Sequence, residues 1–324
     1  MTHAIRFHQT GGPEVLSWEE VAVGKPGPNE ARIRHTAVGL NFIDIYNRSG
    51  LYPVPLPSGL GGEGAGVVEE VGSGVTDLKP GDRVAYGNSP VGAYSEARLI
   101  PADRLLKLPD GIDDKSAAAM MLKGLTAQYL IRQTYRVKKG DTILLHAAAG
   151  GVGLILSQWA KHLGATVIGT VGSDDKAKLA KAHGCDHTIV YTSEDFAKRV
   201  DEITGGKKVP VVYDSVGKDT FLKSLDCLAL RGMMVSFGNA SGPPDPIAPG
   251  ILAQKGSLFL TRPTLFNYIA TRPELEQAAG ELFGMLAGGK VKVEVKQRFA
   301  LAEAAEAHRA LEGRKTSGST VLTI

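Results

Sequence analysis

The chain has 324 residues, of which 43% are hydrophobic and 22% charged, with a formal net charge of +3. These proportions are typical of a globular protein, and the length predicts two domains rather than one hydrophobic core. No apolar run approaches the roughly 18 residues that cross a membrane, and no secretory signal is evident. Because the two cysteines, Cys185 and Cys227, form neither a disulfide framework nor a metal-binding pair, we expect a cytoplasmic protein. The small net charge does not indicate a nucleic-acid-binding surface.

The first part of the chain carries short candidate strands separated by turns rich in glycine and proline. The expected strands are Ala31–Val38, Gly66–Val71, Asp82–Tyr86 and Gly92–Ile100. Segments such as Gly24–Asn29 and Leu78–Asp82 mark turns between them. The pattern predicts a β-rich, barrel-like module, which a helix at Lys115–Arg132 connects to the middle of the chain.

The segment Thr142–Gly153 joins a short apolar strand to a glycine-rich turn and then to an amphipathic stretch. Its pattern is Ala148-x-Gly150-x-x-Gly153, so alanine replaces the first glycine of the usual dinucleotide-binding fingerprint. Apolar strands separated by helix-like segments follow at Ala165–Thr170, His187–Val190, Val209–Asp214 and Met233–Phe237. This alternation predicts a parallel, doubly wound α/β sheet, with a pyrophosphate bound at the start of the first helix.

The last part of the chain is expected to return to the first module. The expected elements are a helix at Glu274–Ala287, a strand at Val291–Phe299, a helix at Ala302–Leu311 and a strand at Ser319–Thr323. We therefore predict one domain inserted into another. Residues 1–122 and 262–324 form the first domain, and residues 123–261 form the cofactor-binding domain.

Several motifs stand out by their order and spacing. They are Gly12–Leu16, Asn41–Tyr46, Arg48–Tyr52, Pro57–Val71, Gly81–Val84, Lys123–Thr126, Ala147–Gly153, Tyr213–Gly217 and Ser236–Asn239. Together they resemble the zinc-free quinone oxidoreductases, the branch of the medium-chain dehydrogenase/reductase superfamily that includes zeta-crystallin. The resemblance covers essentially the whole chain. It implies a GroES-like catalytic domain, a Rossmann cofactor domain, NADPH as the cofactor and a quinone as the acceptor.

The motifs also differ from those of the zinc alcohol dehydrogenases in the same superfamily. Those relatives carry a catalytic cysteine at the position of Asn41, and Gly-His-Glu where this chain has Gly61-Gly62-Glu63. Because no cysteine precedes Cys185 and the 8 histidines show no paired spacing, we expect no metal site. Alcohol oxidation needs a Lewis acid to stabilise the alkoxide, so the expected reaction is hydride transfer to an activated acceptor, such as a quinone or an enone.

The cofactor-binding residues are expected at the glycine-rich turn and after the second parallel strand. Gly150, Gly151 and Val152 are expected against the pyrophosphate at the helix N-terminus. The resemblance implies a cradle for the 2′-phosphate of the adenosine ribose, formed by Gly172, Ser173, Lys176, Tyr191 and Arg314. A cationic cradle favours a phosphate dianion, so we expect NADPH to be preferred over NADH.

Further cofactor contacts are expected nearer the nicotinamide and along the carboxyl edge of the parallel sheet. The candidates are Lys123 and Thr126 on the nicotinamide side, and Ser215, Phe237, Gly238 and Asn239 at the sheet edge. Asp174 and Asp175 would disfavour a phosphate if they faced it. We expect both to face solvent at the start of a helix, where the helix dipole stabilises them.

The candidates for contact with the nicotinamide and the acceptor are Asn41, Tyr46 and Tyr52. The amide of Asn41 can form hydrogen bonds where zinc relatives have a metal ligand. Tyr46 and Tyr52 can donate to a quinone oxygen or stack on its ring, although an ordinary structural role is nearly as plausible for Tyr52. Glu63 has no partner that the sequence identifies, and a structural ion pair near the site is one interpretation of it. No dedicated general acid is evident, which leaves water as the proton source.

The sequence is compatible with three functions. The leading hypothesis is an NADPH-dependent, zinc-independent quinone reductase. The second is an NADPH-dependent enone or 2-alkenal double-bond reductase, which needs the same hydride donor but a different acceptor pocket. The third is an NADPH-sensing RNA-binding protein, against which the modest charge and the lack of interleaved basic and aromatic residues argue. The apolar segment Ser257–Thr261 is expected at the edge of the parallel sheet and predicts a homodimer, as in relatives.

Overall fold

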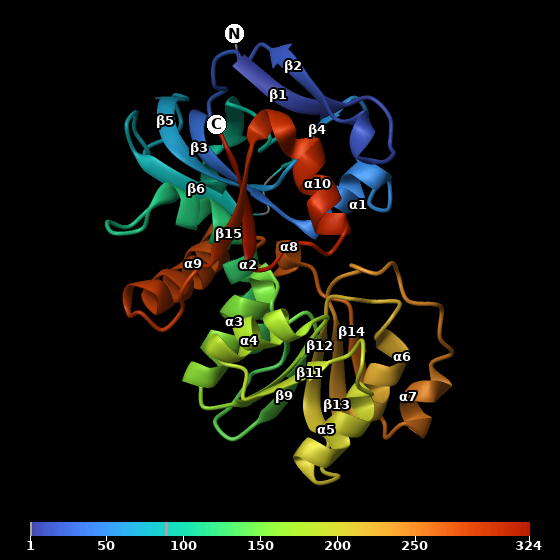
Figure 1. Ribbon diagram of the computed structural model, residues 1–324. Coiled ribbons are helices and arrows are strands. Elements are labelled where there is room, and N and C mark those ends of the chain that lie inside the picture. Colours follow the sequence, from blue (N-terminus) through green and yellow to red (C-terminus); the bar gives the residue numbers. More distant parts are fainter. Residues whose placement is uncertain (1, 88–89) are drawn as a thin grey trace. The chain divides into compact units, whose positions relative to one another are not determined.

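A computed structural model describes residues 2–87 and 90–324. It divides the chain into two compact units, whose elements are labelled in Figure 1. The first unit comprises residues 1–125, 269–283 and 293–324, and the second comprises residues 126–268 and 284–292.

The first unit is built on mostly antiparallel strands. Its larger sheet has the order β15-β16-β3-β5-β6-β8, and β7 also pairs with β3. These strands are β3 (Glu30–Leu40), β5 (Glu63–Val71), β6 (Arg83–Gly87), β7 (Ala97–Pro101), β8 (Leu106–Lys107), β15 (Val295–Ala300) and β16 (Ser319–Thr323). A smaller sheet, β2-β1-β4, consists of β1 (Thr2–Phe7), β2 (Ser17–Val21) and β4 (Ser58–Gly59). The last two strands of the chain therefore belong to this sheet, because β16 lies between β15 and β3.

The core of the first unit follows from the alternation of side chains along its strands. In β3, Ala31 and Ile33 point inward and are fully buried. They belong to an apolar cluster that also includes Phe7 and Leu322, from opposite ends of the sequence. Burial of this apolar surface is the main favourable term in the folding of the unit.

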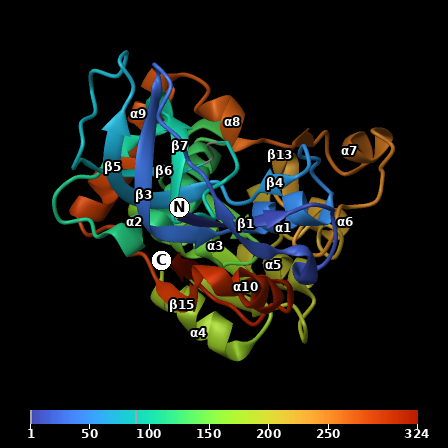
Figure 2. The ribbon, with the colours of Figure 1, turned by 90° about the horizontal axis from the view of Figure 1, so that it is seen from above.

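Four helices belong wholly or partly to the first unit. They are α1 (Phe42–Ser49), α2 (Asp114–Tyr129), α9 (Arg272–Ala287) and α10 (Ala304–Glu312). The first of these ends at Gly50, whose φ of 83° is the left-handed conformation that glycine adopts most readily. In both views α10 lies beside α1 (Figures 1 and 2), which brings the last quarter of the chain next to the segment that follows β3.

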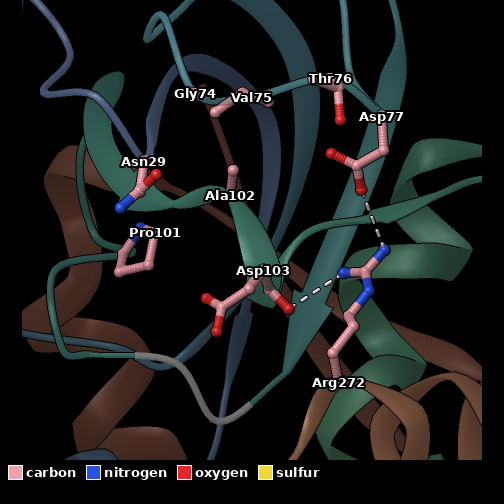
Figure 3. Close-up of a pocket in the computed structure, with 9 residues that line it drawn as sticks. All are labelled: Asn29, Gly74, Val75, Thr76, Asp77, Pro101, Ala102, Asp103 and Arg272. Atoms are coloured by element: carbon pink, nitrogen blue, oxygen red, sulfur yellow. Dashed lines mark hydrogen bonds and ion pairs between the residues drawn. The ribbon is translucent and has the colours of Figure 1, made fainter.

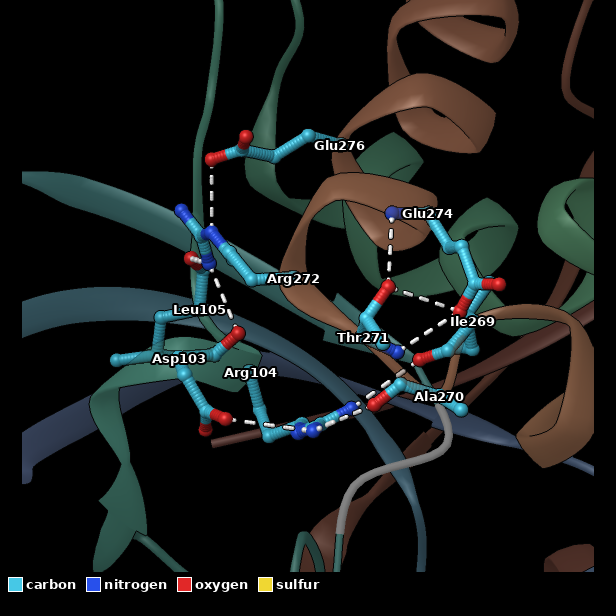
Figure 4. A network of polar contacts seen from close by, with 9 residues as sticks. All are labelled: Asp103, Arg104, Leu105, Ile269, Ala270, Thr271, Arg272, Glu274 and Glu276. Atoms are coloured by element: carbon cyan, nitrogen blue, oxygen red, sulfur yellow. Dashed lines mark hydrogen bonds and ion pairs between the residues drawn. The ribbon is translucent and has the colours of Figure 1, made fainter.

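Two arginines fasten the returning segment to the first unit (Figure 4). The guanidinium of Arg104 donates to the carbonyl oxygens of Ile269 and Ala270, at 3.2 and 3.1 Å. Arg272, at the start of α9, donates to the carbonyl oxygens of Asp103 and Leu105, at 2.9 and 2.6 Å. All four carbonyl oxygens lie outside the strands, so they have no partner in a sheet. The charged guanidinium groups satisfy them instead.

The second unit holds a six-stranded parallel sheet with the order β11-β10-β9-β12-β13-β14. Its strands are β9 (Thr142–Leu145), β10 (Thr166–Val171), β11 (His187–Val190), β12 (Val209–Asp214), β13 (Leu228–Ser236) and β14 (Phe259–Thr261). Its helices are α3 (Gly151–His162), α4 (Asp174–Ala182), α5 (Phe196–Thr204), α6 (Phe221–Ser224), α7 (Gly250–Gln254) and α8 (Leu265–Tyr268). Figure 1 shows α3 and α4 on one side of this sheet and α5 and α6 on the other, so the predicted doubly wound α/β fold is confirmed.

The strand order reverses direction between β9 and β12. From β9 the chain proceeds outward through β10 to β11, and then returns to place β12 on the other side of β9. Ligands of such sheets bind at this switch point, beyond the carboxyl ends of the strands. The glycine-rich turn follows β9 directly, so it lies at that place.

Some predicted elements were wrong in extent. The strand expected at Gly92–Ile100 begins only at Ala97, because Gly92 (φ 129°) and the residues after it form an irregular turn. The strand expected from Val291 begins at Val295. The helix expected to Arg132 ends at Tyr129 and continues as a π-helical segment, Leu130–Thr134. The strand expected from Ser257 begins at Phe259, and it does form the edge of the sheet.

Candidate functional site

In the first unit, the candidate site begins where β3 ends. Asn41 follows β3 directly and has an extended backbone that starts α1. Its backbone N–H donates to Asp44 Oδ2 at 2.8 Å, and the Asp44 N–H donates to the Asn41 carbonyl oxygen at 3.1 Å. This pair of contacts is a helix N-cap arrangement, so it fixes the main chain at Asn41. The side chain of Asn41 is buried.

A fully buried carboxylate joins Asn41 to Lys123. Glu63, the first residue of β5, is 0% exposed. Its Oε2 accepts hydrogen bonds from Asn41 Nδ2 and from Lys123 Nζ, both at 2.8 Å, and its Oε1 accepts the Leu122 N–H at 2.8 Å. Three donors therefore compensate the charge of Glu63, which is what a buried carboxylate requires. Sequence reasoning found no partner for Glu63, since its partners are 22 and 60 residues away.

The close approach of α2 to β3 makes this cluster possible. A Cβ atom on Gly39 would lie 2.2 Å from the carbonyl oxygen of Ala118 in α2 and 2.2 Å from Glu63 Oε2. Only glycine leaves room for both the helix backbone and the carboxylate at this point. The main chain that carries Lys123 is therefore held at a fixed distance from the strand that precedes Asn41.

A chain of buried hydrogen bonds leads away from Asp44. Tyr94 Oη donates to Asp44 Oδ2 at 2.9 Å, and His308 Nε2 lies 3.2 Å from Tyr94 Oη. Arg48 Nη1 lies 3.0 Å from His308 Nδ1, and the Arg48 guanidinium also binds both carboxylate oxygens of Glu312. Because arginine can only donate, His308 Nδ1 is the acceptor, and Nε2 carries the proton that it donates to Tyr94.

Burial dominates the electrostatics of this chain. Desolvation raises the pKa of Asp44 to about 7, against the opposing hydrogen bonds from Asn41 and Tyr94 and the charge of Lys123. Desolvation, together with the Arg48 charge, lowers the pKa of His308 to about 3. The imidazole is therefore neutral at physiological pH, as the hydrogen-bond pattern requires.

The two candidate tyrosines meet each other. The ring centroids of Tyr46 and Tyr52 lie 5.1 Å apart in an edge-to-face arrangement, and the Tyr52 N–H donates to the Tyr46 carbonyl oxygen at 3.0 Å. The ring of Phe42 lies 6.2 Å from that of Tyr46. Tyr46 is buried and Tyr52 half-buried. Together they form an aromatic surface that follows Asn41 along the chain.

In the second unit, the glycine-rich turn leaves the start of α3 uncapped by any side chain. Gly150 is the N-cap and has no side chain to bind the first N–H groups of the helix. A Cβ atom on Gly153 would lie 2.4 and 2.6 Å from the carbonyl oxygens of Ala147 and Ala148, so helix and turn pack against each other without side chains between them. This geometry fits a pyrophosphate at Gly150, Gly151 and Val152.

Four of the residues predicted to hold the 2′-phosphate lie together after β10. Ser173 is the N-cap of α4, and its Oγ accepts the Lys176 N–H at 3.4 Å. A Cβ atom on Gly172 would lie 3.3 Å from the Tyr191 hydroxyl, which places that hydroxyl over the glycine. Arg314 belongs to the first unit, after α10, and its part in the cradle stays a prediction.

The two aspartates that follow Ser173 face solvent. Asp174 and Asp175 are both exposed in the first turn of α4, as expected. The Asp175 side chain is 93% exposed and pairs with Lys178. Both carboxylates therefore lie at the start of α4, where the helix dipole stabilises them.

The remaining candidates of the second unit follow β12 and β13. Phe237 N–H donates to the Asp214 carbonyl oxygen at 2.7 Å, and a Cβ atom on Gly238 would lie 2.7 Å from the Ser215 carbonyl oxygen. The turns that carry Ser215, Phe237, Gly238 and Asn239 therefore lie side by side at the switch-point edge. Thr126, on α2, is buried in this unit, whereas Lys123 belongs to the first.

Sequence reasoning missed the group that shapes this edge, Asp214. Its buried carboxylate accepts the N–H groups of Val216 and Gly217, at 2.7 and 3.1 Å, and the Thr220 hydroxyl at 2.8 Å. An aspartate that binds the backbone two residues later is a turn signal, and this signal was available in the sequence.

Neither a metal-binding cluster nor a membrane-spanning helix is found in the part of the chain that the structure describes. No group of three or more histidine, cysteine, aspartate or glutamate residues within 2–87 and 90–324 is arranged to hold a metal ion. No helix in those ranges is both long and apolar enough to cross a membrane.

A pocket of about 440 Å³ in the first unit contains none of the candidate residues (Figure 3). It is lined by Asn29, Gly74, Val75, Thr76, Asp77, Pro101, Ala102, Asp103 and Arg272. Arg272, the one cationic residue of this lining, is already engaged by Asp77 and Glu276 and by two backbone carbonyls. The arginine therefore has a structural role in holding α9.

Comparisons with known proteins cover nearly the whole chain and point to one family of dehydrogenases and reductases. Residues 27–110 match the family described as alcohol dehydrogenase GroES-like domain, and residues 151–283 match the zinc-binding dehydrogenase family. A quinone oxidoreductase of Pseudomonas aeruginosa is 60% identical over 99% of both chains, and a 2-haloacrylate reductase of Burkholderia sp is 52% identical over 99% of both. The structure of Escherichia coli quinone oxidoreductase complexed with NADPH has a TM-score of 0.98 and 54% identity, over 99% of this chain and 100% of that chain.

Proposed function

Because this chain belongs to the zinc-independent quinone oxidoreductases of the medium-chain dehydrogenase/reductase superfamily, we propose that it reduces quinones by hydride transfer from NADPH. The observation that carries the proposal is the uncapped start of α3 at the switch point of the parallel sheet, next to the Gly172–Tyr191 cradle. Within this proposal, residues 123–261 form the cofactor domain, and residues 1–122 and 262–324 form the catalytic domain; the second compact unit differs in starting at residue 126, ending its main part at 268 and including residues 284–292.

The residues of the second unit fit NADPH in chemistry as well as in shape. Gly150, Gly151 and Val152 would hold the pyrophosphate, because the first N–H groups of α3 have no acceptor within the helix. Ser173 and Lys176 would bind the 2′-phosphate with a hydroxyl and a cation. When bound, the nicotinamide supplies the hydride, and the protein's part is to orient it and to bind the acceptor.

The residues of the first unit supply polar and aromatic contacts for the acceptor. Glu63 holds the amide of Asn41, so the other polar groups of that amide keep one orientation. Tyr46 and Tyr52 provide a ring surface against which a planar quinone can stack. Negative charge develops on the acceptor oxygen as hydride arrives, and fixed donors stabilise it.

A specific observation supports a second candidate function. The relative named 2-haloacrylate reductase is 52% identical to this chain over nearly its full length. Reduction of an activated carbon–carbon double bond uses the same hydride donor, and its charge develops on an enolate oxygen. An enone or 2-alkenal reductase is therefore the alternative, and the shape of the acceptor pocket decides between the two.

The edge of the parallel sheet supports a homodimer, and the two free, buried cysteines support the cytoplasm as its location. Phe259 and Leu260 in β14 are 58% and 39% exposed, and Leu230 in the neighbouring β13 is 80% exposed. An apolar edge strand of this kind is open to pairing with a second copy. Sedimentation analysis of the wild type and of Phe259→Asp tests this assignment, since a charge at the edge disfavours self-association.

The direct test is the oxidation of NADPH in the presence of p-benzoquinone, 2-cyclohexenone or acrolein, followed by loss of the nicotinamide absorbance. We expect the quinone to be the fastest acceptor and NADPH to be preferred over NADH. Faster turnover with the enone or the alkenal would favour the alternative function. Absence of turnover with all three acceptors would contradict both.

A further inference from the structure

The cluster of Lys123, Glu63 and Asn41 places an ammonium group beside the candidate acceptor site. Lys123 is 5% exposed, so its side chain is nine-tenths buried. Within residues 2–87 and 90–324, the one hydrogen-bond acceptor of Lys123 Nζ is Glu63 Oε2, at 2.8 Å. An ammonium has three N–H groups, so two remain for a bound molecule. The same Glu63 oxygen binds Asn41, which places the ammonium and the amide around one atom.

We propose that Lys123 is the proton donor to the reduced acceptor. The inference rests on the proposed function, in which the nicotinamide transfers a hydride, and therefore two electrons, to the acceptor. For a quinone this gives the hydroquinone monoanion. Its oxygen then takes a proton from Lys123, so an N–H bond breaks and an O–H bond forms. The neutral amine stays bonded to Glu63 and recovers a proton from water.

Two other titratable groups near Asn41, Asp44 and Tyr94, are hydrogen-bonded to each other. Asp44 Oδ2 accepts two hydrogen bonds, one from the Asn41 backbone and one from Tyr94. The Tyr94 hydroxyl lies between Asp44 and His308. A proton leaving His308 could not be replaced along this chain, because the next member is Arg48, which does not release protons. This chain therefore fixes the backbone at Asn41, and it does not relay protons from solvent.

The structure also accounts for the position of the ammonium. Glu63 is bound at its second oxygen by the Leu122 N–H, from the residue that precedes Lys123. The carboxylate thus holds both the main chain and the side chain at this point of α2. Since Gly39 lets α2 approach β3 closely, the ammonium has little freedom to move away from Asn41. A donor held in this way needs little reorganisation when negative charge develops on the acceptor oxygen.

The test compares Lys123→Met with the wild type and with Lys115→Met, a matched control on the exposed part of the same helix. Turnover with NADPH and p-benzoquinone, the Kd for NADPH and the melting temperature are measured for all three. We expect kcat of Lys123→Met to fall at least about 100-fold, the usual contribution of a proton donor, while the Kd changes by less than about threefold. Lys115→Met is expected to match the wild type.

A second variant separates chemistry from folding. In Lys123→Ala, ethylamine added to the assay can occupy the vacated space and carry the proton. We expect kcat to rise with ethylamine concentration by at least about tenfold, whereas ethanol of similar size gives no rise. A lysine with a purely structural role would not be replaced in this way.

Three results would overturn the inference. The first is a kcat of Lys123→Met close to that of the wild type. The second is a loss confined to NADPH affinity, which would make Lys123 a cofactor-binding residue. The third is an equal response of Lys123→Ala to ethylamine and ethanol. These results differ from a failure of the proposed function, in which the wild type itself would oxidise no NADPH with quinones or enones.

Discussion

Substitution of Asp44 by asparagine should stabilise the first unit at alkaline pH and leave it unchanged in acid. Burial raises the pKa of Asp44 from 3.8 to about 7. A carboxyl whose pKa is raised on folding contributes stability that is full below its unfolded pKa and is lost as pH rises through its folded pKa. A rise of this size corresponds to about 4 kcal/mol, lost progressively between about pH 4 and pH 7.

Asparagine copies the neutral carboxyl. Its amide oxygen can accept the hydrogen bonds that Asp44 Oδ2 receives from Asn41 and Tyr94, and it does not ionise. We therefore expect Asp44→Asn to be more stable than the wild type by up to about 4 kcal/mol at about pH 8, and to match it within about 1 kcal/mol at about pH 4.

The assay is urea unfolding followed by tryptophan fluorescence at several pH values. The chain has two tryptophans, Trp18 in the first unit and Trp159 in the second. In a Trp159→Phe background, the fluorescence of Trp18 therefore reports on the unfolding of the first unit. Asp110→Asn, an exposed aspartate of the first unit, is the control and should show no such trend. A stability difference between Asp44→Asn and the wild type that stays constant across this pH range would refute the reasoning.

Three further predictions follow from the packing and charges described above. Gly153→Ala should weaken NADPH binding at least tenfold in a fluorescence titration, because the added Cβ would meet backbone oxygens at 2.4 and 2.6 Å and move α3 off the turn; an unchanged Kd would contradict the pyrophosphate assignment. Arg48→Met should destabilise the first unit by about 3–5 kcal/mol in urea unfolding, since it leaves a buried network without its cation, and a loss below about 1 kcal/mol would mean that the network contributes little. Burial lowers the pKa values of His35 and His308 to about 3, so stability should be full above pH 6.5 and should fall below it by up to about 1.4 kcal/mol per pH unit for each histidine, as stability measured against pH would show.

The parallel sheet was predictable because its signals are local. From β9 to β12, each strand is a short apolar run that is followed within a few residues by a helix, and the glycine-rich turn marks the first crossover. β16 agrees with the expected Ser319–Thr323 at both ends, since turn residues and a helix bound it clearly. The helix α1 was not predicted as an element, although its motif residues were noted, because eight residues carry little periodic signal.

The contacts of the candidate site were less predictable than its residues. Asn41 and Lys123 were singled out, but not the carboxylate that joins them, because nothing in the sequence indicates that β5 and α2 bring Glu63 to both. The contact between Arg48 and His308 spans 260 residues, and such a pair leaves no pattern in one sequence. The error at Gly92–Ile100 is of another kind: the alternation of residue types was right for a strand, but the irregular turn that starts at Gly92 delays the strand until Ala97.

The position of β16 between β15 and β3 has a consequence for how the protein is made. During synthesis the ribosome releases residues 126–268 well before residues 319–323, so nearly all of the second unit can fold while the first unit still lacks two strands. Until then the end of β3 over Ala37–Leu40, which pairs with β16, presents an open edge to other nascent chains. Premature termination near residue 318 would therefore yield a chain with a complete parallel sheet that is nonetheless prone to aggregate, and chaperone binding during translation is expected to concentrate on the N-terminal strands.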